Sequence, residues 1–334
     1  MSFRPRFCPY SDCPSRATQP VLCRRRGFFE RDCDHRVVPR FFCLTCSRTF
    51  SEQTFRVDYR LKRPDLLGRL FLDRISKVTH RQSARNHACS RTTEERHFRR
   101  LSTHCKAFHD QRMAEVAARG GLGQVFLLDE LETYEHHRTE KPVTVPILIE
   151  RYSGFVLDAR PGALASRQAR DRAGPKNTCD ATRRRSESRR VVKEAFERLR
   201  DASPKDRPLY VLTDLKPSYG ALLEELFGTR CIHRRTPSGR KRDLQNPLWP
   251  INHTLARVRD NVSRLVRETW AAAKQRAWLA GQLAIWVCYR NYIRGRTNRE
   301  PHEPPAMHLG VQTHRWSVKQ LLEWRIFPPA VAQP

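Results

Sequence analysis

The sequence is poor in acidic residues and contains no long hydrophobic run. Its 334 residues include 35 Asp and Glu against 64 Lys and Arg, which gives a formal net charge of +29. The longest apolar stretch, LAIWVCY at 283–289, is far shorter than the roughly 20 residues that a membrane-spanning helix needs. The opening residues MSFRPRFCPY lack the apolar segment of a secretory signal. We therefore expect a cytoplasmic protein with no membrane partner.

The positive charge is spread along the whole chain rather than confined to a tail. An excess of this size resists compaction unless a polyanion neutralises it. Nucleic acid is the usual polyanion, and arginine binds phosphate through two parallel hydrogen bonds. An arginine-rich genome would explain only part of the excess, because it would raise the number of acidic residues too. The composition therefore favours nucleic-acid binding.

Cysteine is plentiful, with eleven residues. In a reducing compartment, clustered cysteines indicate metal sites rather than disulfides. Two close pairs near the N-terminus could present four thiolates to one tetrahedral Zn²⁺. These four cysteines are Cys8, Cys13, Cys43 and Cys46. Cys23 or Cys33 could replace one of them. Residues 1–58 are therefore predicted to form a zinc ribbon that folds around its metal.

Residues 59–118 are predicted to be helical. Thr79 is the expected N-cap of a short helix ending at Ala84, and Ser90 or Thr92 that of a second helix ending at Leu101. Two short helices joined by a tight turn are typical of a helix-turn-helix. The second would then be the recognition helix and would offer four arginines to DNA. These are Arg91, Arg96, Arg99 and Arg100. The alternative is a basic helical hairpin that only packs on the core.

Residues 119–300 alternate between apolar strands and amphipathic helices, in the order strand, strand, strand, helix, strand, helix, strand, helix. A basic insert at 160–187 interrupts them. Asp129 and Asp214 each end an apolar strand, whereas Glu130 should point to the opposite side of its strand. If the two strands pair in the sheet centre, the aspartates converge. Two convergent carboxylates can hold Mg²⁺ ions for phosphoryl transfer.

Six blocks of the sequence occur in an order and spacing that resemble one protein family. They are RFFCLTCSRTFS, THRQSARNHACSRTTEERHFRRL, LLDELETY, VLTDLKPSYG, LARVRDNVSRLVRETWAAAKQR and PPAMHLGVQTHRWSVKQLL. In turn they resemble the zinc-ribbon knuckle, the helix-turn-helix, the two aspartate blocks, the helix after the third catalytic residue and the Pro-Ala-x-x-Leu-Gly tail of DDE transposases from bacterial insertion sequences. The resemblance covers most of the chain.

The resemblance implies an α/β protein with a ribonuclease H-like mixed-sheet core. The core at 119–300 would follow a DNA-binding zinc ribbon at 1–58 and a helix-turn-helix domain at 59–118, with a tail at 301–334. The implied activity is metal-dependent cleavage at insertion-sequence ends and strand transfer into target DNA. Mg²⁺ or Mn²⁺ would serve catalysis and Zn²⁺ the ribbon. The implied partner is double-stranded DNA in the bacterial nucleoid, bound by a homodimer or larger assembly.

The third metal ligand departs from the family pattern. That ligand is usually Glu, but the corresponding position here is Asn252, followed by His253. The amide oxygen of Asn252 could coordinate Mg²⁺ without a charge, whereas His253 would suit Mn²⁺ or Zn²⁺ better. Asp243 or Asp260 could also supply the ligand. Alternatively, Asn252 only caps its helix and the site is inactive.

Two other functions remain open from the sequence. A catalytically inactive or domesticated transposase-derived DNA-binding protein would keep the N-terminal modules, and Asn252 is its best support. A nuclease or ribonuclease H-like repair enzyme would need the same carboxylates but not two N-terminal DNA-binding modules. In the catalytic reading, Lys216 and Arg259 are further candidates for contact with DNA.

Overall fold

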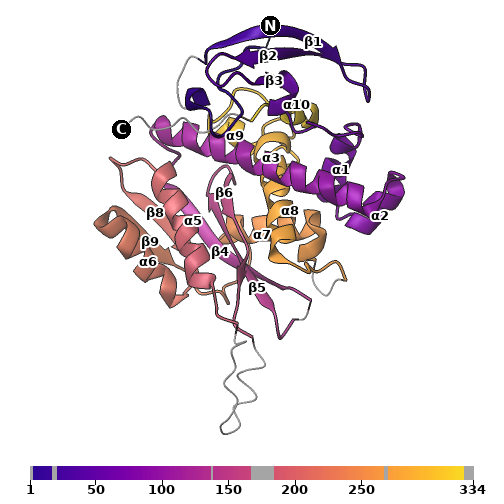
Figure 1. Ribbon diagram of the computed structural model, residues 1–334. Coiled ribbons are helices and arrows are strands. Elements are labelled where there is room, and N and C mark those ends of the chain that lie inside the picture. Colours follow the sequence, from indigo (N-terminus) through magenta and orange to yellow (C-terminus); the bar gives the residue numbers. More distant parts are fainter. Residues whose placement is uncertain (1–2, 17–20, 137, 167–183, 267–269, 327–334) are drawn as a thin grey trace, which may run out of the picture. The chain divides into compact units, whose positions relative to one another are not determined.

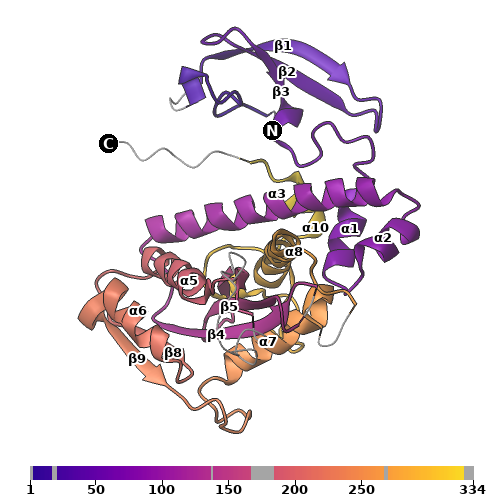
Figure 2. The same cartoon turned by 60° about the horizontal axis from the view of Figure 1, so that its bottom comes forward.

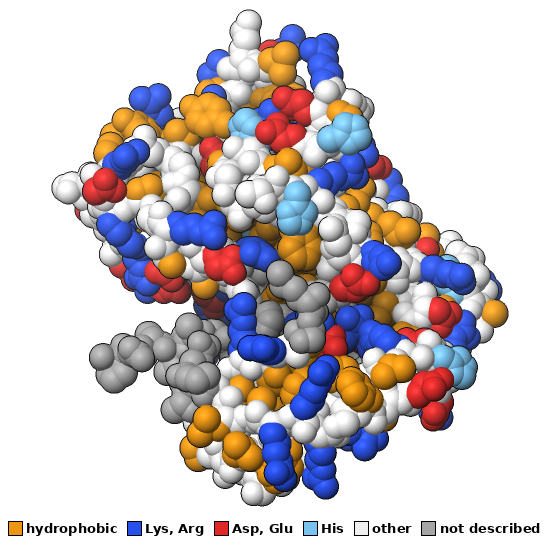
Figure 3. Space-filling view, turned by 90° about the horizontal axis from the view of Figure 1, so that it is seen from above, with side chains coloured by type: hydrophobic (Ala, Val, Ile, Leu, Met, Phe, Trp, Pro, Cys, Tyr) orange, Lys and Arg blue, Asp and Glu red, His pale blue; other side chains and the backbone are white. Residues whose placement is uncertain are grey.

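The computed structural model describes residues 3–16, 21–136, 138–166, 184–266 and 270–326 (Figure 1). Most of the predicted basic insert at 160–187 lies outside these residues. The chain divides into two compact units, Met1–Leu70 with Ser317–Pro334 and Phe71–Trp316. No helix in the described part is long and apolar enough to cross a membrane. Figure 3 shows Lys and Arg side chains scattered among acidic ones over the face in view.

The first unit contains a three-stranded antiparallel sheet. Its strands are β1 (Cys23–Glu30), β2 (Val37–Cys43) and β3 (Thr49–Ser51), in the order β1-β2-β3. One side of this sheet packs on a small core of aromatic rings and sulfur atoms, formed by Phe7, Cys8, Cys13, Phe41, Cys43, Phe50 and Phe55. The unit also contains the short helices η1 (Pro14–Arg16), η2 (Glu52–Phe55) and α10 (Val318–Glu323). Such a core is too small to stabilise a domain by burial alone.

Three helices follow the first sheet: α1 (Leu66–Arg74), α2 (His80–Asn86) and α3 (Arg91–Ala118). The predicted caps are confirmed, because the side chain of Thr79 accepts a hydrogen bond from Gln82 N and that of Ser90 accepts one from Thr93 N. The predicted end of the second helix at Leu101 is wrong. Buried apolar residues recur at helical spacing far beyond Leu101, so α3 continues to Ala118.

The second unit is built on a mixed sheet. Its strands are β4 (Val125–Tyr134), β5 (Pro142–Glu150), β6 (Val156–Ala159), β7 (Gly162–Ala163), β8 (Leu209–Thr213) and β9 (Cys231–Arg235). The order is β6-β5-β4-β8-β9, and β7 pairs with β5. The contacts β4–β5 and β5–β6 are antiparallel, whereas β4–β8 and β8–β9 are parallel. The unit is thus mixed α/β, with the sequence of strands and helices that was predicted.

Helices cover both faces of this sheet (Figure 2). On one face lie α5 (Ser188–Ala202) and α6 (Pro217–Phe227), and on the other α7 (Trp249–Asn261). The α7 face forms an apolar core in which Leu127 and Leu131 of β4 pack with Ile251 and Leu255 of α7 and with residues of α8 (Arg276–Cys288). The remaining short helices are η3 (Gly228–Arg230), η4 (Ser263–Leu265), η5 (Tyr289–Ile293) and α9 (Pro305–His308).

Helices α3 and α8 pack closely at Gly281. A Cβ atom added there would lie 2.6 Å from Ser102 Oγ and 3.1 Å from Phe98 Cε1. Glycine therefore allows the two helices to approach more closely than any larger residue would. This contact holds α3 against α8 within the second unit.

Candidate functional site

Asp129 and Asp214 lie on neighbouring parallel strands and in matching positions. The pairing of β4 with β8 ends at Leu127 opposite Leu212, and each aspartate comes two residues later. Because side chains alternate along a strand, each aspartate faces the same side as the leucine before it. Both leucines belong to the core against α7. The two aspartates therefore face α7, side by side.

The predicted strand end at Asp129 is wrong, although the one at Asp214 is confirmed. β8 ends at Thr213, directly before Asp214. β4 continues through Asp129 to Tyr134, because β5 pairs with it over that whole length, from Phe126 opposite Glu150 to Tyr134 opposite Pro142. Asp129 thus lies where β4 loses its neighbour β8 but keeps its neighbour β5.

Helix α7 brings Asn252 to the two aspartates. Leu248, Asn252, Leu255 and Arg259 recur every three or four residues and so share one side of the helix. These four residues and both aspartates line a cavity of about 230 Å³. The rest of its lining is Glu130, Pro237, Ser238, Arg242, Asn246 and Ala256. Arg242 and Asn246 were not foreseen, and only the basic run SGRKRD at 238–243, which contains Arg242, hinted at a role.

Asn252 is not a helix cap. α7 begins at Trp249, with Leu248 in the N-cap position, so Asn252 lies inside the helix and its backbone N–H bonds to the carbonyl of Leu248 at 3.0 Å. Within the described part of the chain, its side-chain amide has no hydrogen-bond partner. That amide is therefore available to a ligand in the cavity.

None of the alternative third ligands lines this cavity. The ring of His253 packs on Trp249, with ring centroids 4.8 Å apart. Burial lowers the pKa of His253, and the nearby Arg257 and Arg290 lower it further. Asp260 pairs with Lys77 at 2.7 Å. Asp243 is partly buried in the loop before α7, where it accepts a hydrogen bond from Gln245 N at 3.1 Å.

The pKa of Asp129 is raised from 3.8 to about 6. Burial is the main cause, and the nearby carboxylates of Asp214 and Glu130 raise it further. The hydrogen bond from Glu130 N at 2.7 Å and the charge of Arg242 act in the opposite direction without cancelling the effect. A cation bound near Asp129, in addition to Arg242, would favour the ionised carboxylate and so lower this pKa.

Glu130 occupies the other face of β4. Its carboxylate accepts hydrogen bonds from Tyr219 at 2.7 Å, from Ser188 at 2.9 Å, and from Thr144 and Lys216. Burial acts to raise the pKa of Glu130, but these hydrogen bonds, with Lys216 foremost, outweigh it and lower the pKa. Glu130 therefore remains ionised and fully bonded within the protein.

The pair of Glu130 and Lys216 connects the segments that carry the two aspartates. Glu130 N donates to Asp129 Oδ1 at 2.7 Å, and Lys216 N donates to Asp214 Oδ1 at 3.0 Å. The ion pair thus joins β4 to the start of α6 beyond the point where the β4–β8 ladder stops. Lys216 is occupied by this pair, and a contact with DNA would have to compete with it.

The four arginines predicted to read DNA differ in their surroundings on α3. Arg91 pairs with Glu95 at 2.7 Å, and the guanidinium of Arg99 stacks 5.0 Å from the ring of Trp278. Arg96 is exposed, whereas Arg100 is half-buried. Their contact with DNA stays a prediction.

The four cysteines predicted to bind zinc lie together. Their sulfur atoms are all within 4.8 Å of one another. The distances Cys8–Cys46 and Cys13–Cys43 are 3.7 and 3.8 Å. Tetrahedral zinc with a Zn–S bond of roughly 2.3 Å requires S···S distances of about 3.8 Å. Cys23 and Cys33 are outside the cluster.

The surroundings of Cys43 favour its thiolate form. Burial acts to raise its pKa, but hydrogen bonds from the hydroxyl of Ser15 and the backbone N–H groups of Cys46 and Thr45 outweigh burial and lower the pKa to about 6. Backbone N–H groups directed at the sulfur are what the predicted knuckle requires. The site fits Zn²⁺ in its ligands and its distances.

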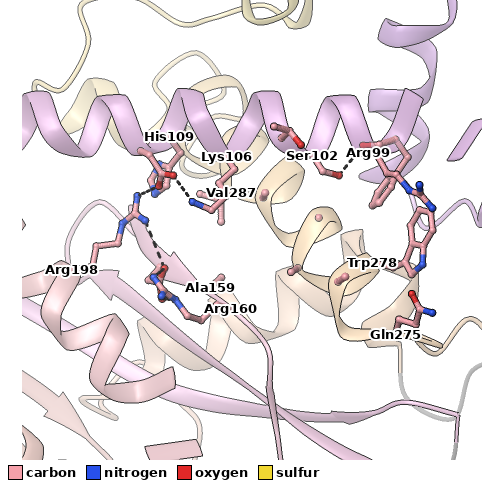
Figure 4. A pocket seen from close by; sticks show the side chains of 18 residues that line it. Arg99, Ser102, Lys106, His109, Ala159, Arg160, Arg198, Gln275, Trp278 and Val287 are labelled. Atoms are coloured by element: carbon pink, nitrogen blue, oxygen red, sulfur yellow. Dashed lines mark hydrogen bonds and ion pairs between the residues drawn. The ribbon is translucent and has the colours of Figure 1, made fainter. Parts of the chain in front are cut away.

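A larger cavity, of about 730 Å³, lies between α3, α5, α8 and β6 (Figure 4). Its charged groups mostly bind one another: Asp110 pairs with Arg198 at 2.8 Å and Asp158 with Arg160 at 2.6 Å. Buried His109 is bonded through both ring nitrogens, and burial is the main cause that lowers its pKa to about 3. Among the described residues that line this cavity, the carboxylates and His109 are already bonded, so the smaller cavity is the better candidate.

Comparisons with known proteins give only weak likenesses. No family model and no curated protein matches the chain. A chain of the simian T-cell lymphotropic virus intasome in complex with PP2A regulatory subunit B56 gamma is similar over 56% of this chain, with 13% identity and a TM-score of 0.30. This chain spans about half, 54%, of that chain. A chain of the Mos1 Strand Transfer Complex is similar over 68% of this chain and 76% of its own length, with 13% identity and a TM-score of 0.24.

Proposed function

We propose that the protein is a DNA transposase that uses divalent metal ions to cleave DNA at insertion-sequence ends and to join those ends to target DNA. One observation carries the proposal. Two carboxylates on neighbouring parallel strands and an unpartnered amide on α7 line the same cavity. Catalytic roles for Asp129, Asp214 and Asn252 are part of the proposal.

The topology supports a ribonuclease H-like core. Three antiparallel strands, β6-β5-β4, continue into two parallel strands, β8 and β9. The aspartates lie at the junction between the two halves, where side chains of both strands can meet α7. In the DDE transposases that the sequence resembles, the two aspartate blocks supply such carboxylates.

The donor set fits Mg²⁺ or Mn²⁺. Carboxylate and amide oxygens are the ligands that these hard cations prefer, and two carboxylates supply the negative charge. Burial is the main cause of the raised pKa of Asp129, and the carboxylates of Asp214 and Glu130 add to it, so a bound cation would favour the ionised form. When bound, the metal ions would activate a water or a 3′-hydroxyl and stabilise the leaving oxygen.

The chain's own residues would hold and orient the reactants. Asp129 and Asp214 would fix the metal position, and Asn252 would complete the shell without adding charge. Arg242 and Arg259 line the same cavity and would bind the phosphate under attack. In this proposal the zinc ribbon and the α2–α3 helices hold the DNA, and a homodimer or larger assembly brings two ends together.

A catalytically inactive, transposase-derived DNA-binding protein is the second candidate. It is favoured by Asn252, which stands where the family usually has Glu. Without a third acidic ligand, metal binding would be weaker, and the cysteine cluster and basic helices would still bind DNA.

The test is cleavage of a DNA substrate that carries the repeats flanking the gene, in Mg²⁺ and in Mn²⁺. Wild type should cut at the repeat ends, and Asp129→Ala, Asp214→Asn and Asn252→Ala should not. Asp243→Asn is the matched control, because this aspartate precedes α7 but does not line the cavity. Normal strand transfer by Asp214→Asn would contradict the proposal, and binding without cleavage in either metal would favour the second candidate.

A further inference from the structure

The outer face of the first sheet gathers arginines to which the proposed function assigns no specific contact. Edge strand β1 contains Arg24, Arg25 and Arg26, all exposed, and Arg40 is exposed on β2. Arg24 lies opposite Phe42 in the ladder, and Arg40 precedes Phe42 by two residues. Alternation along β2 therefore places these side chains on one face, opposite to Phe41 and Cys43, which point to the cysteine cluster. We call Arg24, Arg26, Arg40 and Phe42 the arginine face.

Aromatic rings hold these guanidinium groups in place. The guanidinium carbons of Arg24 and Arg26 lie 5.0 and 5.5 Å from the ring centre of Phe42. That of Arg40 lies 4.9 Å from the ring centre of Phe29. Arg26 also donates to Thr49 Oγ1 at 3.0 Å. Stacking of this kind restricts the side chains but leaves the edges of the guanidinium groups free to donate hydrogen bonds.

The charges of the arginine face are not compensated by acidic groups. Within the ranges that the structure describes, no carboxylate pairs with Arg24, Arg26 or Arg40. Other arginines of the same unit do have such partners: Arg31 pairs with Asp58 at 2.9 Å and Arg63 with Asp65 at 2.9 Å. The arginine face is thus a concentration of exposed positive charge without carboxylate partners among the described residues.

We propose that the arginine face binds the phosphate backbone of duplex DNA and does not read bases. A ring that stacks nucleobases must expose its face. The face of Phe42 is already covered by two guanidinium groups, so bases cannot use it as a platform. The free guanidinium edges match phosphate oxygens, to which arginine donates two parallel hydrogen bonds. The inference rests on the proposed function, which takes DNA as the ligand and the zinc ribbon as one of the modules that hold it, and it names the surface and the kind of contact.

The experiment measures the affinity of full-length, zinc-loaded protein for a short duplex of scrambled sequence over a series of salt concentrations. The face variant is Arg24→Gln, Arg26→Gln and Arg40→Gln combined. Each phosphate contact contributes about 0.9 to the slope of log K against log salt concentration. We expect the face variant to reduce this slope by about 2 to 3.

The control variant removes the same charge from arginines that have carboxylate partners: Arg63→Gln, Arg190→Gln and Arg200→Gln, which pair with Asp65, Glu194 and Asp201. Its slope should stay within about 0.5 of the wild-type value. Equal changes in the two variants would show that net charge alone acts and would overturn the proposal, as would an unchanged slope in the face variant. A larger loss on single-stranded than on duplex DNA would indicate base stacking and would also overturn it.

Two further measurements separate folding and catalysis from binding. The zinc content of the face variant should equal that of wild type, because the arginine face is on the side of the sheet opposite to the cysteines. The Asp243→Asn protein, whose substitution lies outside the cavity, should bind the scrambled duplex with the wild-type slope. If no protein cleaves DNA, wild type included, but only the face variant shows a reduced slope, the proposed reaction is contradicted while the DNA-binding role of the arginine face is supported.

Discussion

The raised pKa of Asp129 makes a prediction about stability. An acid whose pKa is higher in the folded than in the unfolded protein stabilises the fold only while it is protonated. For Asp129 this stability is fully present below pH 3.8 and is lost as the pH rises through about 6. Replacement by Asn removes the ionisable group and keeps an acceptor for Glu130 N, so Asp129→Asn should stabilise the metal-free protein at pH 7.

The size of the effect follows from the two pKa values. The interval from 3.8 to about 6 corresponds to about 3 kcal/mol, because one pKa unit is worth about 1.4 kcal/mol. Asp129 keeps some contact with solvent in its cavity, so we expect a gain of about 2 to 3 kcal/mol at pH 7. The gain should shrink steadily towards zero near pH 4.

The assay is urea unfolding followed by tryptophan fluorescence from pH 4 to 8. Five of the six tryptophans, all but Trp324, are in the unit that contains Asp129. Zn²⁺ is supplied for the cysteine cluster, and Mg²⁺ and Mn²⁺ are removed by dialysis rather than by a chelator. Asp243→Asn is the control, because it makes the same substitution outside the cavity. A loss of stability in Asp129→Asn at pH 7, or an equal gain at pH 4, would refute the reasoning.

Three other perturbations have defined outcomes. Gly281→Val should lower the free energy of unfolding by about 1 to 3 kcal/mol, because the added atoms collide with Ser102 and Phe98. Urea unfolding measures this loss, and wild-type stability would contradict the close packing of α3 on α8. Cys43→Ser should abolish stoichiometric zinc in elemental analysis, whereas Cys33→Ser should retain it; zinc retained by Cys43→Ser would reject the four-cysteine site. Glu130→Gln weakens the ion pair with Lys216, which joins the segments that carry the two aspartates, and should therefore raise the Mn²⁺ concentration needed for half-saturation. His253→Ala should leave that concentration unchanged, because His253 does not line the cavity. The opposite result would assign the ligand to His253.

The sequence was sufficient to predict the order of strands and helices in the core because its apolar runs are long and their periods differ clearly. It was also sufficient for the caps at Thr79 and Ser90, which depend on local hydrogen bonds. The end of α3 was missed although Cys105, Phe108, Met113 and Val116 continue the helical spacing beyond Leu101, because the basic residues between them hide this pattern. The continuation of β4 past Asp129 depends on its pairing with β5.

In the candidate site, as in the fold, features that depend on local sequence could be predicted, whereas features that depend on distant segments could not. Asp129 and Asp214 were recognisable because each follows an apolar run in the sequence. Arg242 and Asn246 were not, because only the folded loop brings them to the cavity. The bonding of Lys216 to Glu130 depends on three segments of chain, and no local pattern in the sequence reports it. The arginine face was hidden because the stacking of Arg24 and Arg26 on Phe42 requires the register of β1 with β2.

The central claim is that Asp129, Asp214 and Asn252 hold a divalent metal ion, and Mn²⁺ binding measured by electron paramagnetic resonance tests it most directly. The protein is zinc-loaded, and a short DNA duplex supplies phosphate, so no knowledge of the element's repeats is needed. Saturable binding should be present in wild type and Asp243→Asn, absent in Asp129→Asn and Asp214→Asn, and weakened in Asn252→Ala. Equal binding in all five proteins, or no saturable binding in wild type, would contradict the account.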